Sequence, residues 1–191
     1  MTGSEVLREN LADMLGVEQL ALQRIERQVH DERLRKFNNA LGALQRIDAA
    51  LTTHVAELER NLSTLDGNFE ARLKKAATSV VGSFANIYGK LRSNEPVSKN
   101  LRDDYTLLNM AVISYGMLQT TALALDETQI ASMAQRHMTD LTPFIVELSD
   151  IIPFVLAGEL AAGGKIEDAT VAQQAAAQYR QTWSRDVTMR I

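Results

Sequence analysis

Apolar residues recur at alternating spacings of three and four between residues 34 and 65. The positions on this stripe are Leu34, Phe37, Leu41, Leu44, Asp48, Leu51, Val55, Leu58, Leu62 and Leu65, and all are apolar except Asp48. Only an α-helix, with about 3.6 residues per turn, places side chains at these spacings on one face. A helix of about thirty residues is roughly 45 Å long and needs partners of similar length. The pattern therefore predicts an all-α fold, a four-helix bundle of long antiparallel helices.

Similar apolar stripes predict further helices on both sides of this one. A shorter, alanine-rich stretch is expected in the middle of the chain, as the connection between two pairs of long helices. The predicted helices cover residues 4–29, 34–65, 69–91 and 98–125, a fifth that starts at residue 126, and a terminal segment over residues 167–185.

Particular residues predict where these helices begin, bend and end. Ser4 and Asp126 are expected to cap the first and fifth helices, because short oxygen-bearing side chains accept hydrogen bonds from free N–H groups. We expect Pro143 to kink the fifth helix and Pro153 to interrupt it, since proline lacks the N–H donor that a helix interior needs.

Gly163 and Gly164 separate the bundle from an alanine- and glutamine-rich tail. We therefore predict one bundle domain over residues 1–160 and a C-terminal helical appendage over residues 161–191. The extra helix is expected to pack on the outside of the bundle or to reach a second subunit or another protein partner. We expect a homodimer that forms through an exposed helix face.

The composition of the chain argues against several classes of function. The 191-residue chain has a net charge of −4 and no run of lysine or arginine, so a nucleic acid or an anionic membrane has no electrostatic support as a partner. It has no cysteine, which excludes disulfides and thiolate metal sites. We find no secretory signal, no apolar run of the length that a membrane span needs, and no phosphate- or dinucleotide-binding motif. The sequence predicts a soluble cytoplasmic protein.

Titratable side chains interrupt the apolar stripes of three predicted helices. Glu18 lies on the inner stripe of the first helix, His54 and Glu57 are three residues apart on the long helix, and His137 and Asp140 repeat that spacing on the fifth. A carboxylate from one helix and histidine–carboxylate pairs from two others are typical ligands of bundle metal centres. Imidazole with carboxylate oxygen suits iron, manganese or zinc.

The same side chains also have a purely structural interpretation. Histidine or aspartate near a helix seam is often a hydrogen-bonded core residue, and Glu18 could pair with Arg24 or Arg60. Asp48 is best explained as a residue that fixes the register of the helices. Tyr115 is most simply a core residue, with a role beside a metal as the alternative.

Two segments resemble one known family. The stretch from Asn109 to Leu118, which contains the pair Tyr115-Gly116, and the helix that carries His54-Val-Ala-Glu57 resemble the YciF-like ferritin-like proteins, a group of bacterial stress-associated helical bundles. The resemblance covers roughly residues 5–156. It implies a ferritin-like antiparallel four-helix bundle with a short middle helix and metal ligands at Glu18, His54, Glu57 and Asp140, with His137 next to a further ligand position.

The chain also departs from that family at two expected ligands. Ala111 stands where the resemblance places a glutamate before the Tyr-Gly pair, and Arg136 stands at another ligand position. A di-iron centre needs about four carboxylates and two nitrogens, and a cationic side chain beside it opposes the metal charge. The sequence therefore predicts a stress-associated bundle protein whose metal site is degenerate: weak, single-metal or absent. The alternatives are a di-metal oxidase or iron-handling protein and a structural interaction module.

Overall fold

A computed structural model describes residues 2–65, 95–168 and 170–184 of the chain. Within these ranges all regular secondary structure is helical and no strand is present, which confirms the predicted all-α class. The predicted middle helix over residues 69–91 lies outside the described residues. The elements are α1 (Gly3–Val29), the short 3-10 helix η1 (Leu34–Lys36), α2 (Asn38–Leu65), α4 (Val97–Ala124), α5 (Thr128–Ala162) and α6 (Val171–Ser184).

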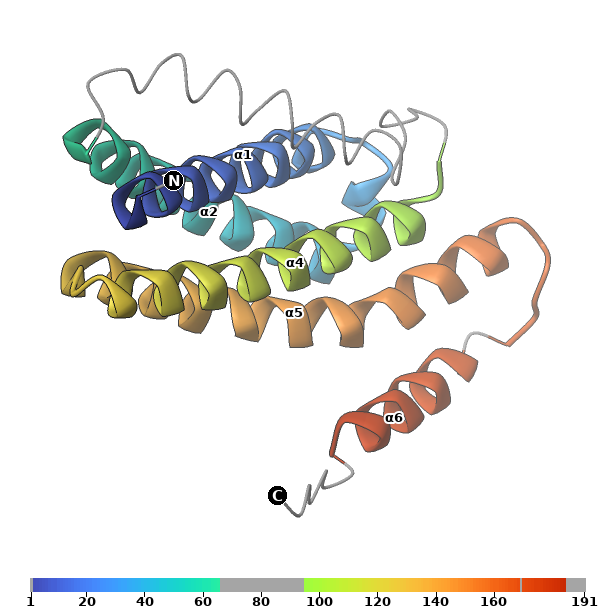
Figure 1. The fold of residues 1–191 in the computed structure, drawn as a ribbon. Helices are drawn as coiled ribbons and strands as arrows, with labels where there is room; N and C mark the ends of the chain where they lie inside the picture. Colours follow the sequence, from blue (N-terminus) through green and yellow to red (C-terminus); the bar gives the residue numbers. More distant parts are fainter. Residues whose placement is uncertain (1, 66–94, 169, 185–191) are drawn as a thin grey trace.

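The four long helices pack side by side, and each runs antiparallel to its neighbours (Figure 1). α1 contacts α2 and α4, and α5 contacts the same two helices. α6 packs on α5, where Ala172 and Ala176 are buried and Arg180 Nε lies 2.7 Å from Asp150 Oδ1. The extra helix thus lies on the outside of the bundle, which is one of the two arrangements that the sequence left open.

The buried stripe of α4 repeats the alternation of four and three without a break. Its members are Val97, Leu101, Asp104, Leu108, Ala111, Tyr115, Leu118 and Ala122, all buried. In the middle of α2, the buried stripe differs from the predicted stripe by one residue. Ile47 and His54 are buried, whereas Asp48 and Val55 are only half-buried. Asp48 therefore lies at the edge of the α2 seam, and not inside the seam where the sequence pattern had placed it.

Three predicted helix ends differ from the structure. Thr2 caps α1 in place of Ser4: its Oγ1 accepts from Glu5 N at 3.2 Å, and the Glu5 carboxylate accepts from Thr2 N at 2.6 Å. The long helix starts at Asn38, because residues 34–36 form η1. Asp126 does not cap α5; its φ of 58° places it in the left-handed turn before the helix.

α5 continues through both of its prolines. Pro143 is exposed, so the carbonyl that loses its intrahelical partner can be hydrated, while Leu141, Ile145 and Leu148 hold the opposite face in the core. Packing of that face keeps the helix intact, and the predicted interruption at Pro153 is wrong. The helix is curved along its length (Figure 1).

By length and composition alone, α4 could cross a membrane, which the sequence pattern did not predict. Its most apolar window has a mean hydropathy of 1.2, and a third of that window is buried inside the protein. The buried side of α4 includes the carboxylate of Asp104 and packs on α1 and α5. Core helices of soluble proteins pass the same test, so this property by itself assigns no membrane role.

The N-terminus of α4 is capped by a residue of α5. Pro96 precedes the helix and offers no side-chain acceptor, and Glu159 Oε1 accepts from Val97 N at 2.5 Å while Oε2 accepts from Ser98 Oγ. We expect Glu159→Ala to lower the free energy of unfolding by about 1–2 kcal/mol, as loss of a helix cap does. Urea denaturation followed by circular dichroism measures this change. The control is Glu147→Ala, which removes only a surface ion pair with Arg46; equal effects of the two variants would contradict the capping role.

Candidate metal centre

Three ligand-type side chains meet in the middle of the bundle. Glu18 comes from α1, His54 from α2 and His137 from α5, and each lies on the buried side of its helix. Their exposed fractions are 0%, 2% and 2%. One ligand atom from each lies within 4.8 Å of the others. The structure therefore brings together three of the five residues that the sequence predicted as metal ligands.

The remaining two predicted ligands bind the outer nitrogens of the histidines. Asp140 Oδ2 lies 3.3 Å from His54 Nε2, and Glu57 Oε2 lies 3.0 Å from His137 Nε2. The contacts are reciprocal: Asp140 of α5 binds His54 of α2, and Glu57 of α2 binds His137 of α5. Glu57 and Asp140 thus orient the imidazoles and do not join the central group.

The inner nitrogens of the two rings face Glu18 and a tyrosine. His54 Nδ1 lies 3.1 Å from Glu18 Oε1, and His137 Nδ1 lies 2.8 Å from the Tyr115 hydroxyl. The two imidazoles are stacked, with ring centroids 3.8 Å apart and an interplanar angle of 8°. Tyr115 meets the His137 ring edge-on at a centroid distance of 5.1 Å. Tyr115 is fully buried, as predicted, and it also completes the polar cluster.

Burial and charge give the two histidines different protonation. Burial lowers the pKa of His54, but the hydrogen bonds and charges of Glu18 and Asp140 outweigh it, so that its pKa is raised. Burial and the neighbouring charge of His54 lower the pKa of His137 to about 4. Burial also raises the pKa of Glu18, although His54 acts in the opposite direction. Two stacked imidazoles cannot both carry a charge at this distance without strong repulsion, so His54 holds the proton and His137 is neutral.

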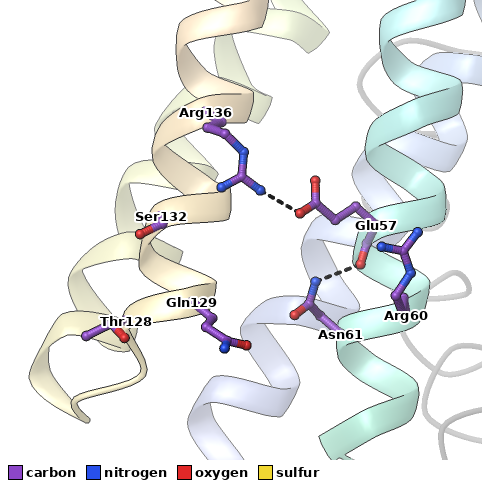
Figure 2. A pocket seen from close by; sticks show the side chains of 7 residues that line it. All are labelled: Glu57, Arg60, Asn61, Thr128, Gln129, Ser132 and Arg136. Atoms are coloured by element: carbon purple, nitrogen blue, oxygen red, sulfur yellow. Dashed lines mark hydrogen bonds and ion pairs between the residues drawn. The ribbon is translucent and has the colours of Figure 1, made fainter.

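A polar groove adjoins the cluster on the surface between α2 and α5 (Figure 2). It measures about 450 Å³, and Glu57 connects it to His137. Arg136 reaches across the groove to Glu57, with Nη2 2.5 Å from Oε1. Burial raises the pKa of Glu57, but His137 and Arg136 outweigh burial and lower it. Glu57 is therefore ionised and held by a neighbouring arginine.

A second buried polar group lies between α1 and α4, and the sequence pattern did not predict it. Asp104 is 1% exposed; its Oδ1 lies 3.3 Å from Arg24 Nε, and its Oδ2 accepts from Gln28 Nε2 at 2.6 Å. Burial raises the pKa of Asp104 to about 6, although Arg24 and Gln28 act in the opposite direction. Arg24, one of the two partners that the sequence allows for Glu18, pairs instead with Asp104, and its Nη2 lies 3.8 Å from Asp103 Oδ2. Asp104 is the one charged residue on the otherwise largely apolar stripe of α4. This pattern could have predicted the buried polar group.

Ala111 also lies on the buried stripe of α4, one turn before Tyr115. It offers no ligand atom, so α4 contributes only the Tyr115 hydroxyl to the described cluster.

Comparisons with family models, with curated proteins and with solved structures find no match to this chain.

Proposed function

We propose that this protein is a ferritin-like bundle of the cytoplasm whose interior binds a single divalent transition-metal ion, iron or manganese. The proposed ligands are Glu18, His54 and His137. The observation that carries the proposal is the convergence of these three buried side chains within 4.8 Å. A role in stress rests on the sequence resemblance alone and is part of the same proposal.

The chemistry of the donors supports an ion at this position. Two imidazoles and one carboxylate form the ligand set of many mononuclear iron sites. Metal-bound histidines usually give their other ring nitrogen to a carboxylate, and Asp140 and Glu57 already occupy those nitrogens. In addition, Glu18 Oε2 is buried and has no hydrogen-bond partner in the described part of the chain. A buried acceptor of this kind is satisfied when it binds a cation.

The residues around the cluster favour one ion over two. Ala111 supplies no carboxylate from α4, and Glu57 is already paired with Arg136 and His137. A bound ion would supply Lewis-acid or one-electron redox chemistry, while the chain itself orients the two imidazoles through Glu57 and Asp140 and excludes water. On His137 the ion would take the Nδ1 position that the Tyr115 hydroxyl contacts. We therefore favour a one-ion bundle protein over a di-metal oxidase.

Metal titration of the purified chain tests this proposal. We expect protein stripped with chelator to bind one equivalent of Co²⁺ or Mn²⁺ by calorimetry, and Glu18→Gln or His54→Gln to weaken binding at least about 100-fold. Asp140→Asn removes only an orienting carboxylate, so a loss of about 10–100-fold is expected. The control is His30→Gln, which replaces the exposed third histidine.

The stoichiometry separates the alternatives. Elemental analysis of protein purified without chelator should find close to one equivalent of iron or manganese. Two equivalents would favour the di-metal oxidase. Absence of any bound metal, together with unchanged or increased stability of Glu18→Gln, would overturn the proposal and leave a structural hydrogen-bonded cluster.

A further inference from the structure

A second groove is lined by residues of η1 and its flanks, of the start of α4 and of the end of α5. The start of α4 and the end of α5 lie at the same end of the bundle (Figure 1). The volume of the groove, about 670 Å³, lies within the range of small-molecule sites. No residue of the Glu18 cluster lines it. The two sites are therefore separate, and binding in this groove does not require the proposed metal.

The wall of this groove is largely apolar. Phe37 is half-buried and packs on Gly158 so closely that a Cβ atom there would lie 2.8 Å from the ring. Leu156 remains 45% exposed, and Val97 and Leu160 extend the same surface. A large aliphatic side chain that stays exposed inside a concave site provides an apolar surface for a ligand.

The rim of the groove is basic. Lys36 and Lys165 both line it, and neither has a carboxylate partner among the residues that the structure covers. Arg33 and Lys99 are paired with carboxylates of their own segments, at 2.6 Å and 3.0 Å.

Among the described residues that line the groove, Glu159 is the one carboxylate, and the N-terminal amides of α4 engage it. It does not neutralise the two lysines, and the described lining carries a net positive charge.

We propose that this groove binds a single-chain fatty acid. The carboxylate head is attracted by Lys36 and Lys165, and the aliphatic tail lies on Phe37 and Leu156. Two lysines at the rim of an apolar groove favour an anion with an apolar body over a small, fully hydrated anion, which gains nothing from the apolar wall. A nucleic acid is disfavoured because its phosphates need a continuous basic stripe and the whole chain is acidic.

Displacement of a fluorescent fatty acid from the full chain tests the proposal. A dansyl-labelled undecanoic acid is titrated first, and unlabelled dodecanoate, below its micelle concentration, then competes with it. We expect dodecanoate to displace the probe at least 10-fold better than dodecanol of the same chain length. The double variant Lys36→Gln/Lys165→Gln should weaken dodecanoate binding at least 10-fold and leave binding of dodecanol unchanged.

Matched variants separate the contribution of the carboxylate head to binding from that of the aliphatic tail. Leu156→Gln should weaken both ligands, whereas Val146→Gln, an exposed position elsewhere on the same helix, should weaken neither. Arg35→Gln controls for loss of a nearby charge outside the groove. Equal displacement by acid and alcohol, no effect of the lysine variants, or displacement only by an acidic peptide would overturn the proposal. Circular dichroism confirms that each variant is folded.

Discussion

Arg24→Met is expected to lower the free energy of unfolding by about 3 kcal/mol or more at pH 8. The buried carboxylate of Asp104 then loses its cation, and an uncompensated buried charge typically costs about 3–5 kcal/mol. Methionine keeps much of the packing volume of the arginine stem, so the change reports mainly on the charge. Arg46→Met, which breaks an exposed pair, should cost less than about 1 kcal/mol.

The pH dependence and a second substitution identify the cause. Without Arg24 the pKa of Asp104 rises above its wild-type value of about 6, so Asp104 of the variant takes up a proton at a higher pH than that of the wild type. The penalty of Arg24→Met should therefore shrink as the pH falls from 8 toward about 6 and stay constant at lower pH, where both proteins carry a protonated Asp104. In Arg24→Met/Asp104→Asn the buried charge is absent, and the amide oxygen of the substituted side chain can still accept from Gln28. The double variant should regain most of the lost stability. A penalty that does not change with pH and persists in the double variant would point to lost packing instead.

Hydrophobic periodicity predicts the helices of this protein but not their exact rotation. On α2, Ile47 and Val55 are apolar while Asp48 and His54 are polar, so the stripe can be drawn through 47 or 48 and through 54 or 55. Apolarity alone prefers Val55 to His54 as the buried residue. In the fold His54 is buried because Glu18 on α1 and Asp140 on α5 satisfy its two ring nitrogens. Contacts from other helices decide the rotation, and the sequence of one helix does not contain them.

The same limit applies to the candidate site. The three-residue spacing correctly indicates that His54 and Glu57, and likewise His137 and Asp140, share one region of a helix surface. The spacing does not predict whether Glu57 and Asp140 join Glu18 at the centre of the site or bind the histidine of the facing helix. That outcome depends on the separation of α2 and α5, across which Glu57 and Asp140 bind the outer nitrogens. The sequence could therefore predict the members of the site but not which of them lie at its centre.

Two buried groups should give this protein opposite responses to acid in its metal-free form. The pKa of His137 is lowered from 6.5 to about 4, so the unfolded chain binds a proton there first, and stability is lost as the pH falls from about 6.5 to 4. The pKa of Asp104 is raised from 3.8 to about 6, so the folded chain binds the proton first. Its contribution is fully present below pH 3.8 and is lost as the pH rises to about 6. Each change corresponds to roughly 3 kcal/mol, and in this range they largely cancel.

Variants that remove one group at a time should reveal both slopes. In the presence of chelator, the stability of the wild type relative to Asp104→Asn should fall by about 3 kcal/mol between pH 4 and pH 6.5. Relative to His137→Gln, the wild type should instead gain a similar amount over the same interval. Urea denaturation at several pH values measures both differences. Subtracting the stability of each variant from that of the wild type cancels the ionisations that the two proteins share. If both differences changed with pH in the same direction, either Asp104 would not have a raised pKa or His137 would not have a lowered one.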